Sequence, residues 1–227
     1  AGRDAVGQQA APERRCLAGG QHELEAVLAG VAGTRDEPVA GQTGRLEALE
    51  DRQHGDAFGG FTTEQAGDGG TGAAKCGGNY AGSLVAQQEA AEHGADQVLF
   101  LDRTHDDSVE ELGGMNVFFV HADGRLVTPA LTGTILEGVT RSSILQLGRD
   151  MGLTVEERRV TLAEWAEGVR SGEITEVFAC GTAAVINPIG ELRDEKSTWT
   201  IGDGGSGEVT MSLREELTGI QYGRLED

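Results

Sequence analysis

Apolar positions are distributed unevenly along the chain, and the pattern changes near residue 70. Residues 1–70 contain no Ile, Met, Trp or Tyr, and their Val, Leu and Phe together number 11 of 70. This share lies below the roughly 20% at which a chain has too little apolar surface to bury a core. We therefore expect residues 1–70 to be mostly disordered or poorly packed, and residues 71–227 to form the folded domain.

The first segment also has a second interpretation. Its glycines follow no period, and only a weak helix at 23–28 is indicated. The bias towards Gly, Ala, Arg and Asp resembles translation of a GC-rich gene in a wrong reading frame. The sequence leaves open whether residues 1–70 are the native start of the protein.

Residues 71–227 alternate between apolar runs and segments of helical periodicity. Helices are predicted where apolar side chains recur on one face, at 81–93, 142–151, 162–170 and 207–221. Strands are predicted at 97–102, 116–121, 125–128, 154–160 and 176–186, the last interrupted by a turn at Cys180-Gly181-Thr182. Asp123-Gly124 between two of these strands is a strong hairpin signal. The predicted fold class is α/β or α+β, with antiparallel pairing at the hairpin.

Composition excludes several classes of protein. The 38 acidic and 18 basic residues give a net charge of −20, which argues against a nucleic acid or an anionic membrane as partner. No run approaches the roughly 20 apolar residues that a membrane span needs, and the first thirty residues lack the apolar core of a signal peptide. Cys16, Cys76 and Cys180 have no CxxC spacing, so neither a metal site nor a disulfide framework is indicated. We expect a reduced, cytoplasmic setting.

Lysine is rare in this chain, and one of the two lysines lies in an unusual place. Lys75 stands among small residues just ahead of the helix predicted at 81–93, and Tyr80 follows five residues later. A lysine with a lowered pKa can attack a carbonyl and hold it covalently, whereas arginine cannot. Small neighbours would let a flat ring approach the backbone. The alternative, which composition alone favours, is a surface lysine in a loop.

Three further turns carry groups that suit a charged ligand. Glu110 and Glu111 precede two glycines, and a carboxylate buried there would need a positive partner such as a protonated pyridine nitrogen. The alternative is a pair of solvated acids. The turn at 136–141 opens a helix, whose free N–H groups and positive dipole end favour a phosphate. The small-residue turn at 178–184 could bind a phosphate or carboxylate through its N–H groups, although alone it is only a tight turn.

Together these segments resemble the class IV (fold type IV) aminotransferases, which use pyridoxal 5′-phosphate. The family signature is matched, gaps included, by Glu111-x-Gly113-x-x-Asn116-Val117-Phe118, Leu126-x-Thr128 and Leu136-x-Gly138-Val139-x-Arg141. Two segments resemble one group within this class, the branched-chain amino acid aminotransferases. These segments are Lys75-Cys-Gly-Gly-Asn-Tyr80 and Cys180-Gly-Thr-Ala-Ala184. The resemblance covers about residues 71–227 and implies the C-terminal domain of the D-amino acid aminotransferase-like fold.

The resemblance implies roles around the cofactor ring. Lys75 would form the internal aldimine and then move the proton between the substrate and the cofactor. Tyr80 would hydrogen-bond the cofactor phenolate oxygen, and Glu111 would pair with the pyridinium nitrogen. Desolvation of Lys75 would lower its pKa so that it can act as the base.

It also implies how phosphate and substrates are held. Val139, Thr140 and Thr182 would bind the phosphate, and Gly114 and Ala183 would contact the substrate. Leucine, isoleucine and valine would donate their amino group to 2-oxoglutarate. By resemblance the protein would be a homodimer of branched-chain amino acid biosynthesis.

Two departures from the family leave alternatives open. Glu137 stands where the family usually has proline. The family's N-terminal domain, which supplies an arginine to the phosphate and aromatic residues to the side-chain pocket, has no match in residues 1–70. The chain could therefore be a truncated or mistranslated product with little activity. Another class IV enzyme, a D-amino acid aminotransferase or an aminodeoxychorismate lyase, is the remaining alternative.

Overall fold

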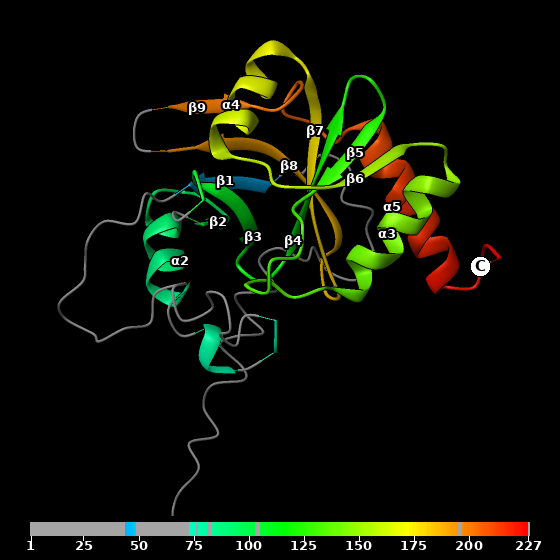
Figure 1. The fold of residues 1–227 in the computed structure, drawn as a ribbon, viewed down its shortest axis with the longest axis horizontal. Coiled ribbons are helices and arrows are strands. Elements are labelled where there is room, and N and C mark those ends of the chain that lie inside the picture. Colours follow the sequence, from blue (N-terminus) through cyan, green and yellow to red (C-terminus); the bar gives the residue numbers. More distant parts are fainter. Residues whose placement is uncertain are drawn as a thin grey trace, which may run out of the picture.

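A mixed, nine-stranded sheet with helices on both faces is the central feature of the computed structural model (Figure 1). The structure describes residues 44–48, 73–75, 77–80, 83–102, 105–194 and 197–226. Within these residues the α/β class expected from the hydrophobic pattern is confirmed.

The strands follow an order that brings distant segments side by side. They are β1 (Gly44–Ala48), β2 (Gln97–Asp102), β3 (Ser108–Leu112), β4 (Asn116–His121), β5 (Arg125–Thr128), β6 (Thr154–Glu157), β7 (Ile174–Gly181), β8 (Val185–Arg193) and β9 (Thr198–Thr200). The order across the sheet is β3-β2-β1-β8-β7-β4-β5-β6, and β9 pairs with β8. β1 is parallel to both of its neighbours and β5 is parallel to β6, whereas the other pairs are antiparallel.

Four α-helices and one short 3₁₀ helix accompany the described strands. They are η2 (Gly77–Tyr80), α2 (Ser83–Glu92), α3 (Val139–Asp150), α4 (Leu162–Ser171) and α5 (Glu208–Gln221). Figure 1 shows α3 and α5 next to each other, and α4 separate from them beside β9. No helix in the described part of the chain has both the length and the apolar content to cross a membrane.

Strand β4 lies at the centre of the core because it is buried on both faces. On one face Phe118 stacks on Phe178, its partner in β7, with ring centroids 5.1 Å apart, and α3 and α5 cover this side. On the other face Phe119 meets Trp165 of α4 edge-on at 5.0 Å. Alternate side chains of one strand therefore hold both helical layers, which makes β4 a rigid base for the residues at its ends.

Most predicted elements are confirmed, including the hairpin of β4 and β5 and the strand at 97–102. Two boundaries were wrong: the strand predicted at 154–160 ends at Glu157, and the single strand at 176–186 is the antiparallel pair β7 and β8. The turn therefore lies at 182–184, after Gly181 pairs with Val185, and not at 180–182. β3 and β9 were not predicted, since paired glutamates and a three-residue length hide the strand pattern.

One strand comes from the segment that we expected to be poorly packed. Gly44–Ala48 forms β1 between β2 and β8, so these five residues belong to the sheet. The weak helix at 23–28 and most of residues 1–70 lie outside the described residues. The domain boundary near residue 70 therefore stays a prediction.

Candidate functional site

A glycine turn joins β3 to β4 and brings two polar side chains to the same hairpin. Leu112 and Met115 exchange backbone hydrogen bonds of 2.8 Å across Gly113 and Gly114. Both glycines have positive φ, 55° and 116°, a conformation that side chains disfavour. Glu111 on β3 and Asn116 on β4 are the residues next to this closed pair.

Glu111 is a partly buried carboxylate that no charge of the described residues compensates. Burial raises its pKa to about 7, and the neighbouring charge of Glu110 adds to the increase. Within the described residues, no hydrogen bond or ion pair reaches its carboxylate. An acid in this state destabilises the fold when ionised unless a positive group arrives, which is typical of functional sites.

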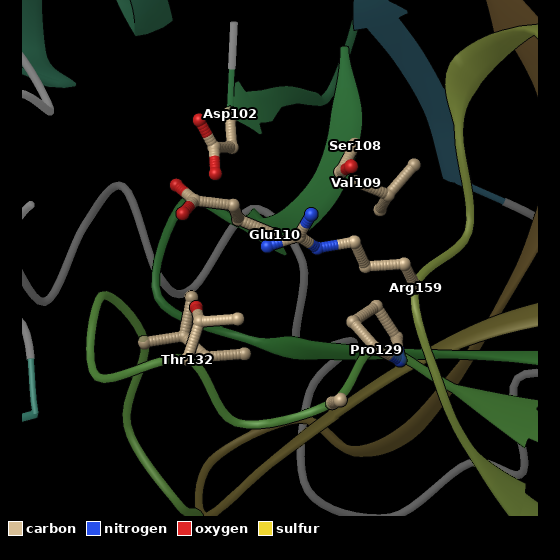
Figure 2. Close-up of a pocket in the computed structure, with 9 residues that line it drawn as sticks. Asp102, Ser108, Val109, Glu110, Pro129, Thr132 and Arg159 are labelled. Carbon is tan, nitrogen blue, oxygen red and sulfur yellow. The ribbon is translucent and has the colours of Figure 1, made fainter. Parts of the chain in front are cut away.

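Glu110 is the neighbour of Glu111 in β3, at a point where the register between β2 and β3 shifts. It is buried, with burial as the main cause of a raised pKa, and Thr134 hydrogen-bonds its side chain. Figure 2 shows its carboxylate pointing towards Asp102 in a small hollow, with Arg159 extending across from the opposite wall. The alternative of two solvated acids was wrong, because both glutamates lie in β3 and burial raises the pKa of each. Glu110 lines the hollow, and Glu111 is not part of its lining.

Asn116 connects this hairpin to the start of α3. Its side chain is 8% exposed, and its Nδ2 donates a 3.1 Å hydrogen bond to the carbonyl of Leu136. Gly138, with φ +71°, lies so close that a Cβ there would be 2.2 Å from the Asn116 Oδ1. The glycine turn at 136–138 is therefore fixed against the first residue of β4.

The first turn of α3 is open. Gly138 is the N-cap residue and provides no side-chain hydrogen bond, and Val139 is 85% exposed. The first N–H groups of a helix have no partner inside the helix, and together with the helix dipole they attract anions. Val139 and Thr140, which we expected at a phosphate site, are the first two residues of this turn.

Arg141 is buried beside the same turn and forms an ion pair inside the protein. It is 3% exposed, and its Nη2 donates to the Pro129 carbonyl at 3.0 Å and to Glu157 at 2.8 Å. Its charge is therefore neutralised inside the protein.

The turn between β7 and β8 lies at the same edge of the sheet. In the ladder of β4 and β7, Cys180 is the partner of Asn116. A Cβ on Gly181 would lie 3.5 Å from the Met115 side chain. Thr182 and Ala183, which follow at once, are exposed. The structure thus brings together three of the four motif segments: the Glu111 hairpin, which includes the exposed Gly114, the start of α3 and the turn at 182–184.

The fourth segment carries Lys75. Lys75 is exposed and lies two residues before the start of η2, while Tyr80 is the last residue of η2 and its side chain is outside the described residues. We expected Lys75 to be buried and so desolvated. The described residues next to it are small and leave it exposed. η2 contacts α2, and Gln87 of α2 approaches the hairpin: its Nε2 would lie 3.2 Å from a Cβ on Gly113. The Lys75 segment therefore leads directly to a helix that touches the Glu111 hairpin, and the pairing of Lys75 with Glu111 stays a prediction.

Sequence reasoning gave no role to Asn116, Gly138 or Arg141. All three are among the matched positions of the signature, yet only the folded chain shows that they hold α3 against β4 and β6. At one edge of the sheet, the carboxylate of Glu111 could therefore pair with a cation. The free N–H groups at the start of α3 could bind an anion at the same edge.

Comparison with known proteins identifies relatives. The family model described as "Amino-transferase class IV" matches residues 64–192. The branched-chain-amino-acid aminotransferase of Mycobacterium tuberculosis (strain ATCC 25618 / H37Rv) is 59% identical over 162 residues, which are 70% of this chain and 44% of that protein. The enzyme of the same name from Mycolicibacterium smegmatis is 56% identical over 166 residues, 72% of this chain and 45% of that protein. The chain thus spans less than half the length of these curated relatives.

Solved structures of branched-chain amino acid aminotransferases are also similar to this chain. The Escherichia coli branched-chain amino acid aminotransferase superposes with a TM-score of 0.63 at 30% identity, over 83% of this chain and 54% of that one. The branched-chain amino acid aminotransferase from Thermobaculum terrenum, in its PLP-containing holo form, gives a TM-score of 0.63 at 31% identity, over 82% of this chain and 53% of that one.

Proposed function

Because the chain belongs to the class IV aminotransferases, we propose that it is part of a branched-chain-amino-acid aminotransferase. The enzyme would transfer the amino group of leucine, isoleucine or valine to 2-oxoglutarate. The observation that carries this proposal is the convergence of Glu111, the open start of α3 and the 182–184 turn at one edge of the sheet.

The residues at this edge fit pyridoxal 5′-phosphate. Glu111 has no positive partner among the described residues, and a protonated ring nitrogen would supply one. The start of α3 has no side-chain cap, and a phosphate would satisfy its N–H groups. When bound, this cofactor supplies an electron sink that stabilises negative charge on the substrate α-carbon. Residues 71–227 would form the cofactor-binding domain.

Each residue would then act on one part of the cofactor or substrate. The Nζ of Lys75 would hold the cofactor covalently and accept the proton from the substrate α-carbon. Tyr80 would hydrogen-bond the ring oxygen, and Glu111 would keep the ring nitrogen protonated. Val139 and Thr140 would donate backbone N–H groups to the phosphate.

The turn at 182–184 would complete the site. Thr182 would bind the phosphate together with the start of α3. Ala183 N–H and the backbone at Gly114 would hold the substrate carboxylate. All three residues lie at or next to exposed turns at the shared sheet edge, where a ligand can reach them.

The assembly and the setting of the enzyme are parts of the same proposal. Lys75, Thr182 and Ala183 are exposed, so an aminotransferase site here needs further cover to exclude water. We propose that the rest of the enzyme and a second subunit of a homodimer provide this cover. The absence of CxxC spacing in the sequence supports a cytoplasmic enzyme of branched-chain amino acid biosynthesis.

The chain offers a matched pair of variants for a test, because Lys75 and Lys196 are its two lysines. With pyridoxal 5′-phosphate added, the wild type and Lys196→Arg should show the absorbance band of covalently bound cofactor, and Lys75→Arg should not. Borohydride reduction should fix the cofactor on the peptide that contains Lys75. A band that survives Lys75→Arg would overturn the assignment of Lys75.

Turnover tests the substrates. Leucine with 2-oxoglutarate should yield glutamate, and D-alanine should not replace leucine. Lys75→Arg should lower the rate by about 10³-fold, the scale of a lost acid–base group, and Lys196→Arg should leave it unchanged. If D-alanine were the better donor, the branched-chain assignment would fail while membership of class IV would stand.

A further inference from the structure

Asn116 lies where the acid-bearing hairpin meets the open helix start. We propose that Asn116 is a positioning residue, which fixes the first turn of α3 relative to Glu111 and so sets the distance between the phosphate end and the ring end of the cofactor site. The proposal rests on the proposed function, since it assumes that a phosphate occupies the start of α3.

The first support is a buried hydrogen bond between distant segments. The Asn116 amide, 8% exposed, donates to the Leu136 carbonyl at 3.1 Å across 20 residues of sequence. A buried side-chain donor is costly to leave unpaired, so this bond ties the loop before α3 to β4. The amide is used inside the protein, which argues for positioning rather than contact with substrate.

The second support is the close approach of Gly138. A Cβ at this position would overlap the Asn116 Oδ1 at 2.2 Å and would lie 3.2 Å from the Arg141 Cβ. With φ +71°, the N-cap of α3 is thus pressed between Asn116 and the helix's own first turn. Any larger residue would have to push α3 away from β4.

The third support is the rigidity of the base. Asn116 is the first residue of β4, a strand buried on both faces, and its partner in β7 is Cys180, two residues before Thr182. On its other side, the pair of Leu112 and Met115 closes the hairpin of Glu111. One residue thus connects three segments of the proposed site, through its side chain to the start of α3 and through its backbone to β7 and the Glu111 hairpin.

The experiment compares pyridoxal 5′-phosphate with pyridoxal, which lacks the phosphate. Relative to the wild-type chain, Asn116→Ala should weaken binding of pyridoxal 5′-phosphate about tenfold, the equivalent of one lost hydrogen bond. Binding of pyridoxal should be nearly unchanged, because Lys75 and Glu111 are untouched. Asn116→Ser, which is too short to reach the Leu136 carbonyl, should behave alike and provides a second variant if Asn116→Ala does not fold.

A double-mutant cycle tests the contact itself. Gly138→Ala should weaken binding of pyridoxal 5′-phosphate by more than tenfold, but it should cost less in the Asn116→Ala background, where the overlap is gone. Gly124→Ala is the matched control: Gly124 also has positive φ, +85°, in a hairpin turn, but a Cβ there meets nothing within 4 Å. It should bear the same type of backbone strain without changing cofactor binding.

The possible outcomes separate the two proposals. If wild-type protein binds neither compound, the proposed function fails, and the positioning role fails with it. If wild type binds but Asn116→Ala is unaffected, or loses both compounds equally, only the positioning role is overturned. If the effects of Asn116→Ala and Gly138→Ala on the binding of pyridoxal 5′-phosphate were additive, this would also contradict the positioning role.

Discussion

Two helices that pack side by side on one face of the sheet begin in opposite ways (Figure 1). Both α3 and α5 have glycine at the N-cap, Gly138 and Gly207. The start of α5 is filled by Glu176 of β7, which accepts hydrogen bonds from Val209 N at 3.1 Å, Thr210 N at 2.8 Å and Thr210 Oγ1 at 2.7 Å. In the part of the chain that the structure describes, no side chain caps the start of α3 in this way.

The difference separates a structural helix start from one that we propose to bind a ligand. A carboxylate at a helix N-terminus pairs with the free N–H groups and the dipole, and α5 has one built into the neighbouring strand. α4 achieves the same with Thr161, whose hydroxyl accepts from Glu164 N at 3.1 Å. The start of α3 lacks this stabilisation from a side chain of the described residues. A bound phosphate would provide it instead.

The largest effect on stability is expected at the filled start. Glu176→Ala removes the acceptor of three hydrogen bonds and should lower the free energy of unfolding by about 3 kcal/mol. Urea denaturation would measure this, with Glu167→Ala on the exposed face of α4 as a control that changes little. Affinity for pyridoxal 5′-phosphate should not change; a large loss of affinity would contradict the separation of the two helix starts.

A smaller and pH-dependent effect is expected at Glu111. Because burial raises its pKa from 4.5 to about 7, the folded state holds a proton that the unfolded state has released, so stability falls as pH rises between these values. In full, this rise in pKa corresponds to roughly 3 kcal/mol, and solvent reaching the partly buried carboxylate reduces it. Glu111→Gln removes the loss and should stabilise the cofactor-free chain by about 2 kcal/mol at pH 8, with no gain below pH 4. Exposed Glu215 provides the control, and an equal gain at both pH values would show that ionisation is not the cause.

The smallest effect on stability comes from giving α3 the charge that α5 already has. Val139→Asp places a carboxylate at the exposed first position of α3 and should stabilise the cofactor-free chain by about 0.5 kcal/mol. It should also weaken the binding of pyridoxal 5′-phosphate at least tenfold, since the new carboxylate and the phosphate compete for the same N–H groups. Val139→Asn, of the same shape but uncharged, should do neither, and unchanged cofactor affinity in Val139→Asp would place the phosphate elsewhere.

The parts of the fold that could be predicted are those whose burial is regular. β4 is apolar on both faces and is bounded by Asp123-Gly124, so its hairpin with β5 was clear from the sequence. β3 was missed because Glu110 and Glu111 resemble a solvated loop, whereas the structure buries one fully and the other partly. The placement of β1 between β2 and β8 depends on long-range pairing that five residues without an apolar pattern do not signal.

The site could be predicted as a set of residues but not as an arrangement. The resemblance of the motifs implied roles for Glu111, Val139, Thr140 and Thr182, and these roles stay predictions. That Asn116 fixes α3, and that Arg141 is neutralised by Glu157, depends on contacts across 20 and 16 residues of sequence. No local spacing reports such contacts.

The most direct test of the account is to follow the backbone amides at both helix starts by NMR while pyridoxal 5′-phosphate is added to ¹⁵N-labelled protein. The account predicts that the amide signals of Val139 and Thr140 shift and saturate together, and that those of Val209 and Thr210, already bonded to Glu176, stay in place. Pyridoxal without the phosphate should leave both pairs unshifted. Two results would contradict the claim that the open helix start holds the phosphate. The amide signals of α5 could shift, or those of Val139 and Thr140 could stay in place in protein that has bound the cofactor.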